Sequence, residues 1–135
     1  MTATLSGPSV SESAFGSAMS LERDLLLVGG PSSASGAGAA VVYRRDDTGA
    51  WVVEGVLTAE GASGYADGRL GSSVLMDRGR ALVGAPRGAS GAGSVLVFES
   101  TDGEWEQSGE LIPEDGVRGS GFGVALEAAR NEIWV

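Results

Sequence analysis

Short apolar runs separated by polar, glycine-containing turns are the main pattern along this chain. Residues 25–28 (LLLV) are continuously apolar, which is typical of a strand covered on both faces. Residues 39–44 (AAVVYR) and 51–57 (WVVEGVL) are rich in β-branched and aromatic side chains, and an Asp-Thr-Gly turn separates them. With the alternation of apolar and small residues over 15–21, these runs predict four short antiparallel strands.

The same pattern occurs again 55 residues further along the chain. Of the 28 positions from Gly16 to Tyr43, 13 are identical to the position 55 residues later, which identifies an internal repeat. Equivalent strands are therefore predicted at residues 70–76, 80–83, 94–98 and 105–111. A third copy begins at residues 122–126 and continues at 131–135, so the chain holds two complete units and half of another.

Four short antiparallel strands per unit predict an all-β protein built from small four-stranded antiparallel sheets. The apolar second strand of each sheet needs a neighbouring sheet to cover its faces. Radial stacking of such sheets produces a β-propeller, so we predict β-propeller-type blades, about two and a half of them, as a partial propeller. A β-sandwich of eight strands is the alternative, and the regular repeat favours blades.

The repeat also divides the chain. The predicted units are a lead-in loop (1–14), a first blade (15–59), a linker (60–69), a second blade (70–113) and the first half of a third blade (114–135). The lead-in lacks a basic region followed by an apolar one, so no signal peptide is expected. Every apolar run is shorter than the roughly 20 residues of a membrane span, so no membrane insertion is expected.

Acidic residues outnumber basic ones by 18 to 9, and the net charge is −9. Nucleic acids and anionic membranes require a basic face, so we exclude both as partners. We interpret the seven acids between residues 99 and 115 as a charged outer strand that discourages edge-to-edge aggregation. Cysteine and histidine are absent, which excludes disulfides and removes the commonest general base.

The remaining motifs offer no catalytic set. The glycine-rich loops at 36–38 and 88–93 lack the lysine and the strand-to-helix context of a phosphate loop. The carboxylate pairs at 46–47, 104/106 and 114–115 lie at predicted turns or on one outer strand, where they face solvent instead of each other. We therefore predict that the protein is not an enzyme and has no cofactor.

The three tryptophans follow the repeat. Trp51 and Trp105 begin equivalent strands and are interpreted as residues of the core or of the packing between sheets, with a ligand platform as the alternative. Trp134 occupies the position of Leu27 and Leu82 and is expected to be buried in an intact sheet.

A Phe-Gly pair at 15–16 followed by Leu-Val-Gly-Gly-Pro at 27–31 resembles the FG-GAP repeat. Leu-Gly at 70–71 with Leu-Val-Gly-Ala-Pro at 82–86, and Phe-Gly at 122–123, continue the resemblance over residues 15–135. In the family this repeat builds the seven-bladed propeller of integrin α-subunits and of many bacterial secreted proteins. The resemblance implies a role in protein binding or cell adhesion, and an extracellular, cell-surface or periplasmic location.

The sequence departs from the calcium-binding members of that family, which carry an Asp-x-Asp-x-Asp-Gly loop between the two motifs. The matching segments at 22–24, 77–79 and 128–131 contain at most two carboxylates each. Calcium takes about six to eight oxygen ligands, so we predict no metal at these turns.

The loops between strands carry the variable residues (32–36, 87–90, 61–69 and 113–121). They form a Gly/Ser-rich surface with scattered arginines, and its candidate partner-binding residues are Arg69, Arg87, Ser90 and Arg118. We predict a non-enzymatic module, part of a larger propeller, that binds a protein or a glycan. Two alternatives stay open: a structural subunit that joins further blades or copies of itself through open sheet edges, and a scaffold within a larger enzyme whose active site is elsewhere.

Overall fold

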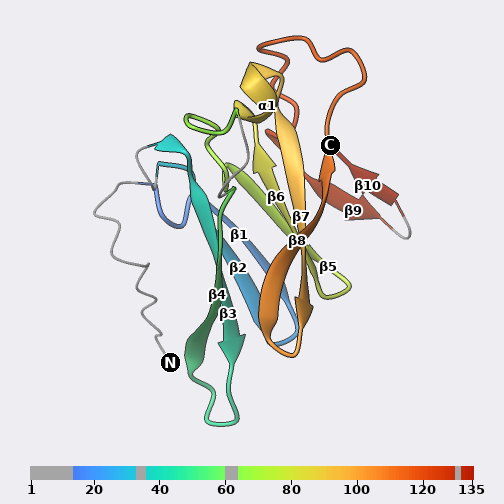
Figure 1. Ribbon diagram of the computed structural model, residues 1–135. Coiled ribbons are helices and arrows are strands. Elements are labelled where there is room, and N and C mark those ends of the chain that lie inside the picture. The colour runs from blue at the N-terminus through green and yellow to red at the C-terminus, as the bar shows by residue number, and fades with distance from the viewer. Residues whose placement is uncertain (1–13, 33–35, 60–63, 130–131) are drawn as a thin grey trace.

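The computed structural model describes residues 14–32, 36–59, 64–129 and 132–135. Within these residues the strands form two four-stranded antiparallel sheets and one two-stranded sheet (Figure 1). The first sheet comprises β1 (Ala18–Glu22), β2 (Leu25–Gly30), β3 (Ala39–Arg45) and β4 (Trp51–Leu57). The second comprises β5 (Ser73–Asp77), β6 (Arg80–Ala85), β7 (Ser94–Thr101) and β8 (Glu104–Leu111), and the third pairs β9 (Glu127–Ala129) with β10 (Glu132–Trp134).

Both large sheets are meanders, because each strand pairs with the next one along the chain. The predicted all-β class and the four-stranded antiparallel units are confirmed. A single short helical turn, α1 (Gly88–Gly91), interrupts the connection between β6 and β7 within the described residues. No helix in that part of the chain has the length and apolar character needed to cross a membrane.

Tight hairpin turns join β1 to β2 and β5 to β6 at the predicted places, residues 22–24 and 77–79, and a similar turn joins β7 to β8. Arg23, Arg78 and Asp102 have φ of 54°, 52° and 52°, because two-residue hairpin loops of the primed type require a left-handed first residue. The ladder between the last two strands of each large sheet also shifts register at equivalent points, between Val42 and Tyr43 and between Val97 and Phe98. The repeat therefore extends to local irregularities of the backbone.

The first strand of each unit begins later than the sequence predicted. β1 starts at Ala18 and β5 at Ser73, because the preceding Gly16 and Gly71 adopt φ of +89° and +96° and turn the chain. In the third unit, β9 covers Glu127–Ala129 in place of the predicted 122–126.

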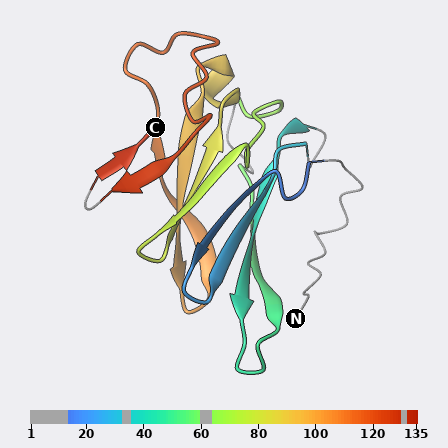
Figure 2. The same cartoon turned by 180° about the vertical axis from the view of Figure 1, so that it is seen from behind.

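The two large sheets pack face to face, and the core lies between them (Figures 1 and 2). β1 and β2 lie against β5, and β4 lies against β8. The first sheet contributes Leu27, Ala40, Val42 and Leu57, and the second contributes Val74, Met76, Val83, Leu96 and Phe98. The two-stranded sheet contacts β5 from the side of the second sheet that faces away from the first (Figure 2).

Close backbone contacts between successive sheets depend on glycine. A Cβ added to Gly29 would lie 2.0 Å from the carbonyl oxygen of Gly71, and one added to Gly84 would lie 2.0 Å from that of Gly123. Gly29 lies within β2. Its lack of a side chain allows the next unit to approach.

The two junctions between successive sheets are alike. A parallel bridge joins Gly38 to Leu70 at the first junction, and an equivalent bridge joins Gly93 to Phe122 at the second. With the paired glycine contacts, these bridges show that the second unit sits on the first as the third sits on the second.

Candidate functional site

The meander gives the stack two different ends (Figure 1). Tight hairpins lie at one end, which we call the turn end (residues 23–24, 46–50, 78–79 and 102–103). The longer connections lie at the other, which we call the long-loop end (residues 64–69, 87–91 and 116–120). The predicted binding residues all fall at the long-loop end.

Backbone hydrogen bonds join the three segments of the long-loop end. The N–H of Arg87 donates to the C=O of Gly68 (3.1 Å), and the N–H of Ser90 donates to the C=O of Gly64 (3.3 Å). The N–H of Gly119 donates to the C=O of Gly91 (2.8 Å). The structure therefore brings together loops that are far apart in the sequence. Residues 33–35 and 61–63 of the predicted loops lie outside the described residues.

The four predicted binding residues are exposed, but their side chains have different surroundings. Arg87 is paired with Asp67 (Nη1 to Oδ2, 2.9 Å). Arg118 lies over the loop at Gly91, where an added Cβ would be 3.6 Å from its Cγ. Neither Arg69 nor Arg118 has an acidic partner within 4.0 Å in the described part of the chain.

The backbone of α1 is held in an unusual conformation. Ala89 and Ser90 have φ of 48° and 59°, which places two successive non-glycine residues in the left-handed region. Such residues carry a conformational cost and persist only where surrounding contacts hold them. The loop that bears Ser90 is therefore shaped by its neighbours at the long-loop end.

A buried tyrosine anchors this end to the second sheet, and sequence reasoning missed it. Tyr65 is 4% exposed, and its hydroxyl donates to Glu110 and bonds the hydroxyl of fully buried Ser94. Burial, then the bond to Glu110, raises the pKa of Tyr65 well above its usual range. The available signal was an aromatic residue within a linker that is otherwise small and polar.

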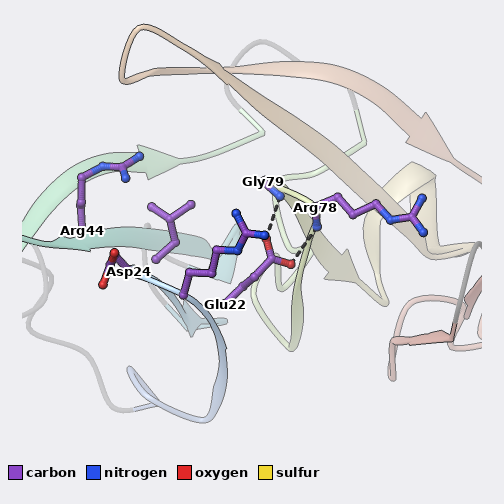
Figure 3. Close-up of a pocket in the computed structure, with 7 residues that line it drawn as sticks. Glu22, Asp24, Arg44, Arg78 and Gly79 are labelled. Carbon is purple, nitrogen blue, oxygen red and sulfur yellow. Dashed lines mark hydrogen bonds between the residues drawn. The ribbon is translucent and has the colours of Figure 1, made fainter.

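The turn end contains a charged hollow of about 620 Å³ (Figure 3). Its lining residues are Glu22, Arg23, Asp24, Leu25, Arg44, Arg78 and Gly79. The Glu22 carboxylate accepts hydrogen bonds from the N–H groups of Arg78 and Gly79, both at 2.8 Å. Glu22 thus fastens the first turn of one sheet to that of the next.

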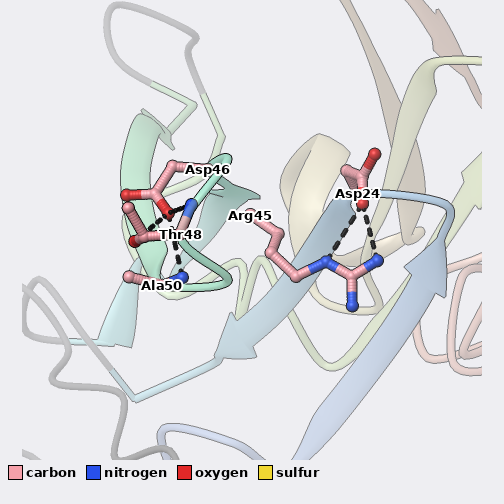
Figure 4. A network of polar contacts seen from close by, with 5 residues as sticks. All are labelled: Asp24, Arg45, Asp46, Thr48 and Ala50. Atoms are coloured by element: carbon pink, nitrogen blue, oxygen red, sulfur yellow. Dashed lines mark hydrogen bonds and ion pairs between the residues drawn. The ribbon is translucent and has the colours of Figure 1, made fainter.

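Most neighbouring charges at the turn end are already paired. Arg45 bonds one oxygen of Asp24 through Nε and Nη2 (3.1 and 2.8 Å), as Figure 4 shows. The same guanidinium lies 5.7 Å from the ring centre of Trp51, within the range of a cation–π contact. Arg44 pairs with Glu54.

The first predicted carboxylate pair shapes a turn. Asp46 accepts hydrogen bonds from the hydroxyl and N–H of Thr48 (2.6 and 2.9 Å) and from the N–H of Ala50 (2.9 Å; Figure 4). These bonds, chiefly the one from the Thr48 hydroxyl, lower the pKa of Asp46. On the acidic strand, Glu104 and Glu106 are exposed as expected. No group of three or more potential metal ligands gathers among the described residues.

The three tryptophans lie in different environments. Trp105 packs on Gly55 of β4 and donates its Nε1–H to Glu54 (2.8 Å), so its predicted role between sheets is confirmed. Trp51 is half-buried on the opposite face of the first sheet. Trp134 is 59% exposed, because its two-stranded sheet has no neighbour within the described chain on that side.

Compared with models of known protein families, the chain matches none, and a comparison with curated proteins also found no match.

Proposed function

We propose that the chain is a non-enzymatic module of FG-GAP-like repeats whose sheets are successive blades of a β-propeller. The support is the recurrence of one packing mode: equivalent bridges and equivalent glycine contacts occur at both junctions. A two-layer sandwich does not need a third sheet on its outer side, whereas a propeller adds each blade in the same way. By its resemblance, the module acts outside the cell, at the cell surface or in the periplasm.

The long-loop end is the proposed binding surface for a protein or a glycan. The observation that carries this proposal is the joining of residues 64–69, 87–91 and 116–120 into one surface by backbone hydrogen bonds. Loops held on a rigid sheet scaffold are the usual place for recognition. The exposed acids at the tip of the β7–β8 hairpin, Asp102, Glu104 and Glu106, lie at the opposite end.

Arg69 and Arg118 favour a partner that presents carboxylate or sulfate groups. A guanidinium bonds such groups through two parallel N–H donors, and neither side chain is occupied by an acid of the described chain. We therefore expect acidic glycans or acidic peptide segments as ligands.

Binding to arrays of carboxylated and sulfated glycans and of acidic peptides tests this proposal. The double variant Arg69→Glu/Arg118→Glu should lose about tenfold or more in affinity for any probe that the wild type retains. Arg23→Glu is the control, because Arg23, like Arg69, is an exposed arginine with a left-handed φ, but it lies at the turn end. Absence of binding to every probe, or equal loss in the control, would contradict the assigned surface.

A further inference from the structure

The first sheet exposes apolar side chains on the face that points away from the second sheet, which we call the outer face. Cross-strand pairing places Met19 and Leu21 of β1 beside Val28 and Leu26 of β2 on this face. Met19 is 64% exposed and Leu21 is 63% exposed. Isolated exposed apolar residues are ordinary on protein surfaces. Met19 and Leu21 are different, because they lie side by side on one face and adjoin the buried cluster of Val28, Val41 and Tyr43, and so extend an apolar surface.

The repeat shows what covers such a face. Val74 and Met76 of β5 are the equivalents of Met19 and Leu21, and they are only 9% and 5% exposed. They are buried because β1 and β2 of the first sheet lie against β5. The outer face is thus the counterpart of a surface that, one unit later, is covered by another sheet of the same repeat.

Glycine contacts of the backbone also indicate that the outer face can receive a further sheet. Gly71 and Gly123 each receive a close approach from the preceding unit, through Gly29 and Gly84 respectively. Gly16 is their equivalent, with a similar φ of +89°, yet a Cβ added there would meet nothing within 4 Å. Among the described residues, the first unit therefore has at Gly16, Met19 and Leu21 the geometry that receives a neighbouring sheet without a sheet against it, while Val28, Val41 and Tyr43 on the same face are buried.

The other end of the stack exposes the complementary surface. Trp134 of β10 pairs with Glu127 in the register in which Leu27 pairs with Ser20 and Leu82 with Leu75. At that position Leu27 and Leu82 are fully buried, and Leu27 belongs to the core between the first two sheets, whereas Trp134 is 59% exposed. The β9–β10 sheet therefore exposes the position that inside the stack covers the next unit.

We propose that a second copy of this chain docks on the outer face through its β9–β10 sheet, with Trp134 of one copy against Met19 and Leu21 of the other. Both halves of a contact that the chain already makes internally are exposed on the same molecule, at opposite ends. Because the two surfaces differ, the association is head-to-tail, and its repetition builds a ring or a filament. This contact joins sheet faces, not strand edges, and it is independent of the proposed binding at the long-loop end.

Sedimentation velocity of the 135-residue chain, from low to high micromolar concentration, tests the docking. The wild type should associate reversibly, and Leu21→Glu should weaken the association about tenfold or more, because it places a charge in an apolar contact. Val56→Glu is the matched control: Val56 is also exposed (48%) but lies on β4, beyond the reach of a two-stranded sheet that covers β1. Far-UV circular dichroism verifies that each variant is folded.

Mixing two blocked variants distinguishes a head-to-tail contact from any other. Met19→Glu/Leu21→Glu retains only the β9–β10 surface, and Trp134→Glu retains only the outer face. Each should be monomeric alone, and an equimolar mixture should form a dimer that does not grow further. A monomeric wild type, a Trp134→Glu variant that still dimerises, or an equal loss of association in Val56→Glu would overturn the proposal.

Discussion

At the scale of single residues, the spacing between sheets depends on glycines that have no room for a side chain. Gly29 and Gly84 lie within strands, and each faces the carbonyl group of a glycine in the next unit. Close-packed interiors cannot absorb an added methyl group against rigid backbone without displacing it. These glycines therefore set how closely one sheet approaches the next.

Gly84→Ala should lower the free energy of unfolding by about 2–4 kcal/mol, because the new methyl group would collide with the Gly123 carbonyl. Gly109→Ala in β8 is the control, since its nearest neighbour would be 4.0 Å away, and it should change stability by less than about 1 kcal/mol. Urea denaturation followed by tryptophan fluorescence measures both. Similar losses in the two variants would show that strand glycines matter here for reasons other than close approach.

At the scale of elements, hydrogen bonds from side chains hold turns, strands and the linker against neighbouring elements. Glu22 binds the backbone of the β5–β6 turn, and Trp105 of β8 bonds Glu54 of β4. Tyr65 attaches the linker between the large sheets to Ser94 and Glu110. Hydrogen bonds within the protein thus hold the β5–β6 turn and the linker in place and join β8 to β4.

Tyr65→Phe should destabilise the protein by about 1–3 kcal/mol, because it leaves the fully buried hydroxyl of Ser94 without this partner. Adding Ser94→Ala should recover part of the loss, since the unpaired hydroxyl is then removed. A double variant with the full sum of the two single losses would contradict direct coupling.

The same tyrosine predicts a pH dependence. Its pKa is raised in the folded protein above the ordinary 10.0, so the unfolded chain releases the proton first. The contribution of Tyr65 to the free energy of unfolding should be constant below about pH 10 and should decrease as the pH rises above that value. In Tyr65→Phe the fall in the urea midpoint above pH 10 should be shallower than in the wild type, and an unchanged slope would count against this interpretation.

At the scale of the whole molecule, the two large sheets share one core. Leu27 from the first sheet and Met76 from the second lie in the same buried cluster, so neither sheet keeps its apolar face covered without the other. We therefore expect the two sheets to unfold together.

Leu27→Ala should cost about 2–5 kcal/mol and should shift the unfolding curves from fluorescence and circular dichroism equally. Met19→Ala, at an exposed position of the same sheet, should cost less than about 0.5 kcal/mol when the protein is monomeric. Two separate transitions in Leu27→Ala would show that the sheets are independent units.

Sequence reasoning reached the strands, the hairpins and the equivalence of the two units, but it missed several particulars of the site. It placed Arg69, Arg87, Ser90 and Arg118 on connecting loops, and the structure puts them at one end. The Arg87–Asp67 pair, the Tyr65 anchor and the hollow at the turn end were not anticipated. Each arises from residues that no local pattern connects.

The sequence alone determined the repeat and the strand order, because strand alternation, turn residues and identical motifs are local properties that need no partner. The tertiary structure decided which apolar faces are covered. Met19 and Val74 occupy the same position in successive units, yet one is 64% exposed and the other 9%. The difference is physical: burial depends on a neighbouring sheet, and among the described residues the second sheet has one against this face of its first strand, whereas the first sheet has none.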